Sequence, residues 1–141
     1  MSSKLFLVLC LLAFIVCEDT VFEVNLNANA LNTFSVKKGK EFKIKLAGNP
    51  TTGYSWFLLN LEALTESNAV ANVDTNEDGS AGGYVSSVPE GESLPGAGGD
   101  FYFTLKAVAK TSEPIDLLFS YQRPWEANNA ANSVTVKINV E

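Results

Sequence analysis

Hydrophobic and polar residues alternate with a period of two along most of the chain. Apolar side chains at alternate positions line one face of an extended strand, while the residues between them face water. The alternation is clearest in five stretches: Phe22/Val24/Leu26, Phe42/Ile44/Leu46, Phe101/Phe103/Leu105/Ala107, Ile115/Leu117/Phe119/Tyr121 and Val134/Val136/Ile138/Val140. Each stretch is predicted to form a strand with one buried face.

The remaining segments complete the predicted elements. Residues 54–61 are apolar on both faces and indicate a central strand, with Trp56 and Leu58 in the core. Residues 61–70 are helix-like for one or two turns, and residues 74–83 have the composition of a solvated loop. The predicted strands are Phe22–Val36, Glu41–Leu46, Tyr54–Leu61, Tyr84–Val88, Asp100–Val108, Pro114–Gln122 and Ser133–Val140.

This succession of about six to eight strands predicts an all-β protein, an immunoglobulin-like antiparallel β-sandwich. The N-terminus has the pattern of a secretory signal peptide, because Lys4 is followed by an apolar block from Leu5 to Val16 and then by acidic residues. A retained membrane anchor is the alternative, although the block falls short of the roughly 20 residues that a spanning helix needs. We therefore predict a signal peptide at residues 1–17 and one mature domain at residues 18–141, with no membrane span.

Cysteine usage and charge narrow the possible functions. The only cysteines, Cys10 and Cys17, fall inside the predicted leader, so the mature domain is expected to have no disulfide and to depend on a hydrophobic core. The net charge of the chain is -6, which disfavours nucleic acid as a partner because phosphate binding needs a clustered basic face.

The inventory of reactive side chains is small. The chain has no histidine, which removes Ser-His and Cys-His pairs and the usual zinc ligands. Acidic pairs at residues 77–78 and 90–92 lie in loop-like sequence, and residues 74–79 match a calcium loop only in part, without the later glutamate. We therefore expect no enzyme, no metal site and no cofactor, and instead expect binding through loops.

Alternate turns of an immunoglobulin-like sandwich emerge at the same end of the fold. The predicted strands place three connections of unusual composition there: "GNPTTGY", "PEGESLPGAGGD" and "RPWEANNAAN". Proline-stiffened backbone, threonine hydroxyls, bare glycine backbone and a tryptophan beside the only arginine are thus predicted to gather on one rim.

Three segments on this rim resemble the NPTTG(Y/F), GxGG and RP(W/F) signatures of the chagasin family, and they occur in the same order. The resemblance spans essentially the whole mature domain. It implies a reversible protein inhibitor of papain-like cysteine peptidases, cathepsin L-like or B-like, that blocks the active-site cleft with three loops and needs no cofactor. The segments are Asn49-Pro50-Thr51-Thr52-Gly53-Tyr54, Gly96-Ala97-Gly98-Gly99 and Arg123-Pro124-Trp125.

The family resemblance also implies a role for each loop. Thr51 and Thr52 would lie beside the catalytic cysteine and histidine of the peptidase, and two stiff β-branched residues at a turn tip are poorly explained by an ordinary hairpin. The glycine backbone would lie against the substrate-binding strand, although a plain flexible loop is the alternative, and Leu94 would enter a specificity pocket.

The third loop would contribute Trp125 as an aromatic anchor on the leaving-group side of the cleft. Pro124 before it and polar residues after it favour a loop position over the core, to which Trp56 is assigned. Arg123 is expected to support this loop by an ion pair or by stacking. A monomer is assumed, located in the secretory route and either secreted or in an endosomal or lysosomal lumen.

Two other functions stay open at this point. A secreted adhesion or carbohydrate-binding sandwich could use Tyr84, Tyr102 and Trp125 as stacking platforms. A purely structural extracellular module would bind neither a peptidase nor a glycan.

Overall fold

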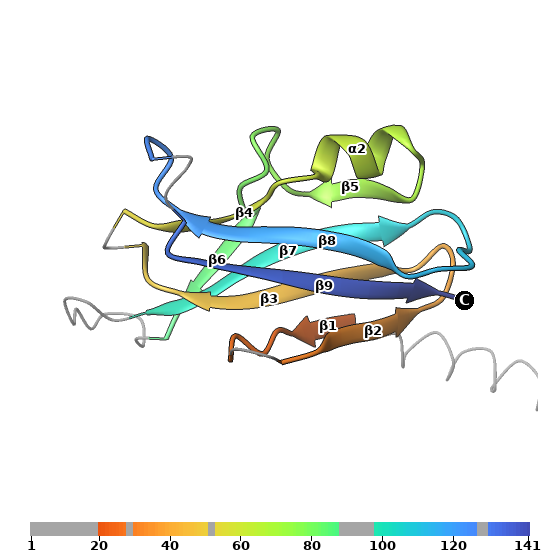
Figure 1. Cartoon of the computed structure of the whole chain (residues 1–141), viewed down its shortest axis with the longest axis horizontal. Coiled ribbons are helices and arrows are strands. Elements are labelled where there is room, and N and C mark those ends of the chain that lie inside the picture. Colours follow the sequence, from red (N-terminus) through yellow and green to blue (C-terminus); the bar gives the residue numbers. More distant parts are fainter. Residues whose placement is uncertain (1–19, 28–29, 51–52, 88–97, 127–129) are drawn as a thin grey trace, which may run out of the picture.

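The computed structural model describes residues 20–27, 30–50, 53–87, 98–126 and 130–141. These residues form two facing β-sheets and one short helix (Figure 1). The elements are β1 (Thr20–Glu23), β2 (Asn32–Val36), β3 (Glu41–Gly48), β4 (Ser55–Leu58), α2 (Leu61–Glu66), β5 (Val70–Asp74), β6 (Gly83–Ser86), β7 (Gly99–Ala107), β8 (Ile115–Gln122) and β9 (Asn132–Val140).

The first sheet has the strand order β1-β3-β7-β5, and β6 also pairs with β7; the second has the order β2-β9-β8-β4. Two pairs are parallel, β1 with β3 and β2 with β9, and the other pairs are antiparallel. The predicted sandwich architecture is confirmed, and the parallel pairs arise because the N-terminal segment contributes one strand to each sheet.

The core lies between the sheets and is built from the predicted alternation. Phe42, Ile44 and Leu46 of β3 are buried while the residues between them are not. Phe103 of β7 meets Phe119 of β8 across the sandwich, with ring centroids 4.9 Å apart. Burying one such side chain contributes about 1.5–3 kcal/mol to stability, so these facing rows stabilise the packing of one sheet on the other.

The predicted strand Phe22–Val36 is wrong as a single element. It is two strands, β1 and β2, which belong to different sheets and are joined by a connection that includes Asn25, Asn27 and Leu31. Apolar and asparagine residues alternate in this connection and imitate a strand pattern, although asparagine favours turns.

The segment after β4 also differs from its prediction. The strand predicted to reach Leu61 ends at Leu58, the helix-like segment 61–70 is helical only in α2, and Val70 begins β5, an unpredicted strand. Asn68 stops the helix by adopting a left-handed backbone conformation, with φ at 60°, which asparagine tolerates better than most residues.

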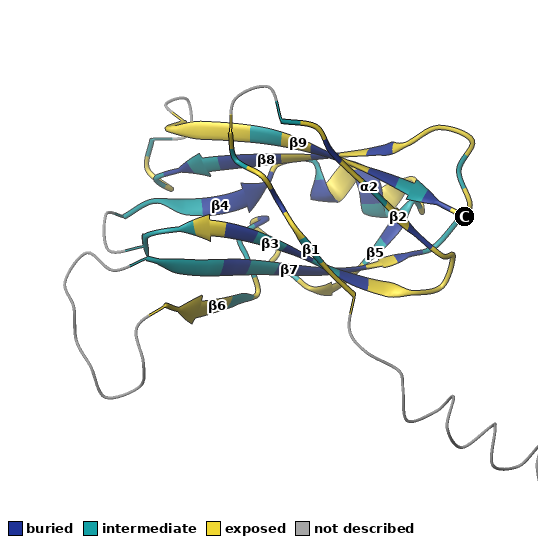
Figure 2. Ribbon diagram, turned by 90° about the horizontal axis from the view of Figure 1, so that it is seen from below, coloured by how far each residue is buried: buried dark blue, intermediate teal, exposed yellow. Residues whose placement is uncertain are grey.

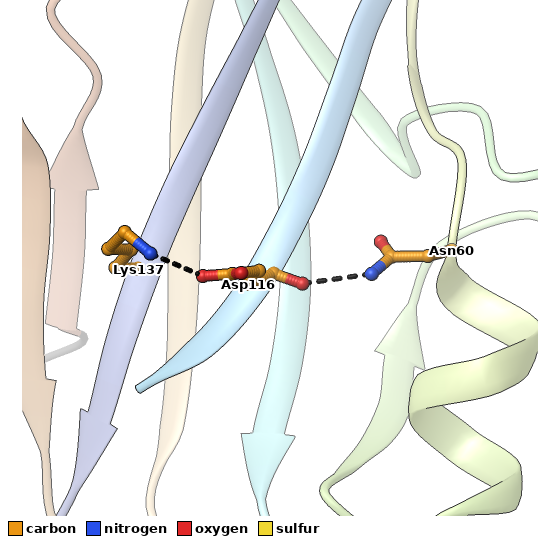
Figure 3. Close-up of polar contacts among 3 residues, drawn as sticks. All are labelled: Asn60, Asp116 and Lys137. Carbon is orange, nitrogen blue, oxygen red and sulfur yellow. Dashed lines mark hydrogen bonds and ion pairs between the residues drawn. The ribbon is translucent and has the colours of Figure 1, made fainter. Parts of the chain in front are cut away.

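Asn60 joins this segment to the second sheet. Its side-chain amide donates a hydrogen bond to the carbonyl oxygen of Asp116 at 2.9 Å and accepts one from the N–H of Leu118 at 3.1 Å. Figure 3 shows the first of these bonds beside the ion pair between Asp116 and Lys137, whose atoms are 2.9 Å apart. The amide of Asn60 therefore continues the β4–β8 ladder after β4 has ended, and it is not used to cap α2.

The other predicted strands agree with β3, β6, β7, β8 and β9 to within a few residues. β3 and β8 end, and β7 and β9 begin, at one end of the sandwich, which we call the loop end (Figures 1 and 2). The β3–β4, β6–β7 and β8–β9 connections all lie there, as the sequence predicted.

Among the described residues, no helix is long and apolar enough to cross a membrane. The predicted signal peptide, residues 1–17, lies outside these residues, as do both cysteines. The boundary at residue 18 therefore stays a prediction.

Candidate functional site

The loop end brings together parts of all three predicted segments. Described there are Asn49, Pro50, Gly53, Tyr54, Gly98, Gly99, Arg123, Pro124 and Trp125. Thr51, Thr52, Leu94 and Gly96 lie outside the described residues. Their predicted contacts with a peptidase stay predictions.

The β3–β4 connection is fixed to β8 by Tyr121. The Tyr121 hydroxyl group accepts a hydrogen bond from the N–H of Asn49 at 2.8 Å and donates one to the carbonyl oxygen of Asn49 at 3.1 Å. The ring of Tyr121 packs between those of Tyr54 and Trp56, with centroid distances of 5.3 and 5.0 Å. One side chain therefore fixes both the first residues of the connection and the side chains that follow it.

Gly53 ends the turn that opens the β3–β4 connection. Its N–H donates to the carbonyl oxygen of Pro50 at 3.0 Å, and its φ is 85°, a conformation that favours glycine. A Cβ atom at this position would lie 3.0 Å from Cη2 of Trp125. The β3–β4 connection and the β8–β9 connection are thus in direct contact at Gly53.

Gly98 lies at the end of the β6–β7 connection, where this connection approaches the end of β3 closely. A Cβ atom there would lie 2.9 Å from the carbonyl oxygen of Gly48, and Gly48 and Gly99 are opposite each other in the β3–β7 register. Ser87 closes the base of this connection, because its N–H and its hydroxyl group both donate to the carbonyl oxygen of Gly98, at 3.0 and 2.6 Å. The absence of a side chain at Gly98 therefore allows the two connections to approach closely.

The guanidinium group of Arg123 packs against side chains of the first and third connections. Its guanidinium carbon lies 4.6 Å from the centroid of the Tyr54 ring and 6.0 Å from that of Trp125, and its Nη1 is 3.6 Å from a carboxylate oxygen of Glu126. The expected stacking and the expected ion pair are therefore both present. The Nε atom is buried and has no hydrogen-bond partner among the described residues, so the guanidinium group is held by the stack on Tyr54 and the ion pair with Glu126.

The two tryptophans have opposite environments, as predicted. Trp56 is 1% exposed and donates its indole N–H to the carbonyl oxygen of Ala47 at 2.9 Å. Trp125 is 70% exposed and stands next to Gly53. A large rigid aromatic side chain held in water at the tip of the molecule is typical of an interface anchor.

The arrangement is suited to binding. Within the described ranges, no group of three or more His, Cys, Asp or Glu side chains could hold a metal ion. The charged groups among the described residues of this end form pairs, Lys45 with Asp100 at 3.8 Å and Arg123 with Glu126. The described part of the loop end is therefore a protruding, largely neutral surface of backbone and aromatic groups.

The tyrosines of the carbohydrate-binding alternative lie on strands of the first sheet. Tyr84 is on β6, and its ring packs against Phe101 at a centroid distance of 4.9 Å. Tyr102 is half-buried on β7. Neither stands beside Trp125 in the contacts of the loop end.

Tyr121 is the functional residue that sequence reasoning missed. Alternation with Ile115, Leu117 and Phe119 assigned it to the inner face of a strand, without a role in the loops. The available signal was a tyrosine in place of an aliphatic residue at the last inward position before Arg123, since a buried hydroxyl group needs a hydrogen-bond partner.

Comparison with known proteins gives concordant results. The model of the family described as chagasin family peptidase inhibitor I42 matches residues 35–140. The chain is 34% identical to Amoebiasin-1 of Entamoeba histolytica over 114 residues, which are 80% of this chain and 94% of that protein.

Two solved structures have a similar fold. The crystal structure of the cysteine protease inhibitor EhICP2 from Entamoeba histolytica matches with a TM-score of 0.56 and 16% identity, over 86% of this chain and 95% of that one. PbICP-C, in its complex with falcipain-2, matches with a TM-score of 0.51 and 19% identity, over 86% of this chain and 99% of that one.

Proposed function

The chain belongs to the chagasin family of peptidase inhibitors, and from this premise we propose that it reversibly inhibits papain-like cysteine peptidases by occluding their active-site cleft with the loop end. Family membership makes it an inhibitor and not an enzyme. The observation that carries the proposal is the close approach of the three segments at the loop end, where Trp125 packs against Gly53 and Gly98 lies against the carbonyl group of Gly48, the last residue of β3.

Rigidity is the physical basis of the proposed mechanism. Loops that are already ordered in the free protein lose less conformational entropy when they dock, so more of the contact energy appears as affinity. The hydrogen bonds of Tyr121 to Asn49 and the stack of Arg123 on Tyr54 order the described ends of the β3–β4 and β8–β9 connections before any partner arrives.

The family signatures supply the proposed placement in the cleft. Thr51 and Thr52, which lie between Pro50 and Gly53 in the sequence, would occupy the catalytic centre, and Trp125 would contact the leaving-group side. The glycine backbone at Gly98 would face the substrate-binding strand of the peptidase, with Leu94 directed to a specificity pocket. The tip would fill the cleft without presenting a peptide bond in a position that the catalytic thiolate can attack.

The partner class is proposed from two sources. The signature segments point to papain-like peptidases of the cathepsin L or B type, and the structural neighbour PbICP-C forms its complex with falcipain-2. The fold neighbour EhICP2 is likewise a cysteine protease inhibitor. We propose that this chain acts on the same class of enzyme, as a monomer.

We further propose that the chain enters the secretory route and acts outside the cell or in an endosomal or lysosomal lumen. The leader pattern of Lys4, the apolar block and the acidic residues after it supports this proposal. Mass spectrometry of the protein isolated from its own cells tests it, since a chain that begins near residue 18 is expected and one that retains Met1 would contradict it.

The direct test of the function is a titration of the purified domain, residues 18–141, against papain and a cathepsin L. A fluorogenic substrate reports the remaining activity, and trypsin serves as the serine-peptidase control. We expect tight, reversible inhibition of the two cysteine peptidases and none of trypsin. Full papain and cathepsin activity at micromolar inhibitor would refute the proposal.

A further inference from the structure

A fourth connection reaches the loop end, and the three family signatures do not include it. β1 runs parallel to β3, which ends at the loop end, and β2 runs parallel to β9, which begins there. The β1–β2 connection must therefore turn on the same side of the molecule, and both views place it there, drawn in orange in Figure 1. Its described residues are 24–27 and 30–31.

The base of this connection is fastened by Asn32. Asn32 is buried, with 5% of its surface exposed, and its side-chain amide accepts a hydrogen bond from the N–H of Asn25 at 2.8 Å and donates one to the carbonyl oxygen of Asn25 at 2.9 Å. The Asn25 side chain accepts a bond from the N–H of Asn27, whose carbonyl oxygen accepts one from Ala30. The described part of the connection is thus ordered by its own hydrogen bonds.

Leu31 stands directly before Asn32 and points an apolar side chain into water. It is 92% exposed, the highest value among the large hydrophobic residues that the structure describes, and Trp125 follows at 70%. A single exposed leucine is common on protein surfaces and would mean little alone. Here the two most exposed hydrophobic residues both belong to connections at the loop end.

Leu31 also lines a groove of about 370 Å³ that continues toward the third connection. Leu26 and Val134 supply the other larger apolar side chains of this groove, and Asn132 and Ser133 line it where the β8–β9 connection enters β9. The groove has amide, hydroxyl and aliphatic walls, with Lys137 as its only charged residue. Its chemistry fits an uncharged, partly apolar surface.

We propose that Leu31 and this groove form a fourth contact with the same peptidase, on the enzyme surface beside the leaving-group side of the cleft. The inference rests on the proposed function, which puts the β8–β9 connection and Trp125 on that side. Continuity of the groove with that connection identifies the occupant, because Asn132 and Ser133 line the groove and directly follow the connection in the chain. The partner surface is expected to be apolar and uncharged.

This contact would determine which peptidases bind tightly. The cleft is the part that peptidases of one class share most closely, whereas the surface beside it is free to differ. A contact outside the cleft therefore separates two enzymes that accept the three loops equally well, chiefly through the dissociation rate.

The test compares Leu31→Asp with Leu59→Asp in the full mature domain. Leu59 is also well exposed, at 59%, but it lies at the junction of β4 and α2, separated from the loop end by the length of β4. We expect Leu31→Asp to raise the inhibition constant for at least one papain-like peptidase about tenfold through faster dissociation, and Leu59→Asp to change it less than twofold. Circular dichroism and thermal unfolding verify that both variants fold.

A second experiment measures amide hydrogen exchange in the wild-type protein. Amide hydrogen exchange at residues 30–33 is expected to slow when the peptidase binds, in addition to slowing in the three signature segments.

Three outcomes would overturn the inference. If Leu31→Asp leaves the inhibition constants for papain and a cathepsin L unchanged, and residues 30–33 gain no protection, the fourth contact alone is overturned. A wild-type chain that inhibits neither enzyme would overturn the proposed function and this inference with it. A concentration-dependent dimer that Leu31→Asp dissociates without changing inhibition would assign the surface to self-association, and would also overturn it.

Discussion

The hydroxyl group of Tyr121 makes hydrogen bonds with both backbone groups of Asn49, a residue 72 positions earlier in the chain. This pair ties the end of β3 to the end of β8 and thereby joins the first and third signature segments through one side chain. The relationship explains how loops far apart in sequence present one surface.

Tyr121→Phe should therefore weaken inhibition while keeping the aromatic stack. The substitution leaves the rings of Tyr54 and Trp56 in place but removes two hydrogen bonds, each with a net contribution of about 1 kcal/mol. We expect the free energy of unfolding to fall by about 1–2 kcal/mol and the inhibition constant to rise severalfold, because the turn is less ordered before docking. Urea denaturation and inhibitor titration measure the two effects.

Tyr102→Phe is the matched control for this variant. Tyr102 is also half-buried on a strand, but its hydroxyl group makes no hydrogen bond to any other described residue. Both the stability and the inhibition constant should stay close to wild type. Equal effects of the two substitutions would mean that the bonds to Asn49 do not order the turn.

Gly98→Ala should disturb the approach of the first two connections. The added Cβ atom would lie 2.9 Å from the carbonyl oxygen of Gly48, so the backbone must shift at a cost of about 1–3 kcal/mol. Inhibition should weaken together with stability. Gly83→Ala provides the comparison, since its nearest neighbour would be Cβ of Tyr102 at an ordinary 3.8 Å, and normal inhibition by Gly98→Ala would contradict the close-approach argument.

Trp125→Ala and Trp56→Ala should affect different properties. Trp125 is exposed, so its loss should leave the free energy of unfolding nearly unchanged while binding weakens by about 2 kcal/mol, roughly thirtyfold. Trp56 is buried, so its truncation should cost about 3–5 kcal/mol of stability. Calorimetry and inhibition titration on both variants measure this contrast; unchanged inhibition by a folded Trp125→Ala would show that Trp125 is not an anchor.

Arg123→Lys tests whether stacking or charge supports the third connection. Lysine keeps the positive charge and can still reach Glu126, but it loses the planar guanidinium that lies on the Tyr54 ring. Inhibition should weaken severalfold. Glu126→Gln removes only a partly exposed ion pair, which contributes less than about 1 kcal/mol, so its inhibition constant should hardly change. A larger effect from Glu126→Gln than from Arg123→Lys would favour charge over stacking.

Asn60→Ala should lower stability without affecting inhibition. The variant loses the two hydrogen bonds that extend the β4–β8 ladder, a loss of about 2 kcal/mol, at a position that does not belong to the loop end. Denaturation should therefore show a less stable protein whose inhibition constant, measured well below its unfolding midpoint, equals that of wild type. A proportional loss of inhibition would indicate that global stability, and not loop geometry, controls binding.

Much of the fold could be predicted because alternation reports burial directly. Strands β3, β7, β8 and β9 each keep one apolar row, and their predicted bounds agree with the observed ones to within two residues. Alternation failed at residues 22–36, where asparagines spaced between apolar residues imitate a strand although their side chains form the turn. β5 was missed because only Val70 in it is buried, so it has no apolar row to detect.

The loops could be predicted from their composition, but their mutual contacts could not. Gly53, the glycine of the first signature segment, has a positive φ, a conformation that favours glycine. That this glycine packs against Trp125, or that Tyr121 reaches Asn49, depends on the relative position of β3 and β8, which no local pattern encodes. The β1–β2 connection was absent from the predicted rim because residues 22–36 were predicted as one strand; its position follows from the parallel pairing of β1 with β3 and of β2 with β9.

The measurement that tests the central claim most directly is binding of the mature domain to papain whose cleft has been filled. Papain whose catalytic cysteine has opened a peptidyl epoxide carries the ring-opened peptidyl group as a thioether that fills the cleft, whereas papain with only an S-methyl group on that cysteine retains most of its cleft. If the loop end occupies the cleft, calorimetry should detect binding to the S-methylated enzyme and none to the filled enzyme. Equal affinity for the two enzymes would place the contact elsewhere and contradict the account.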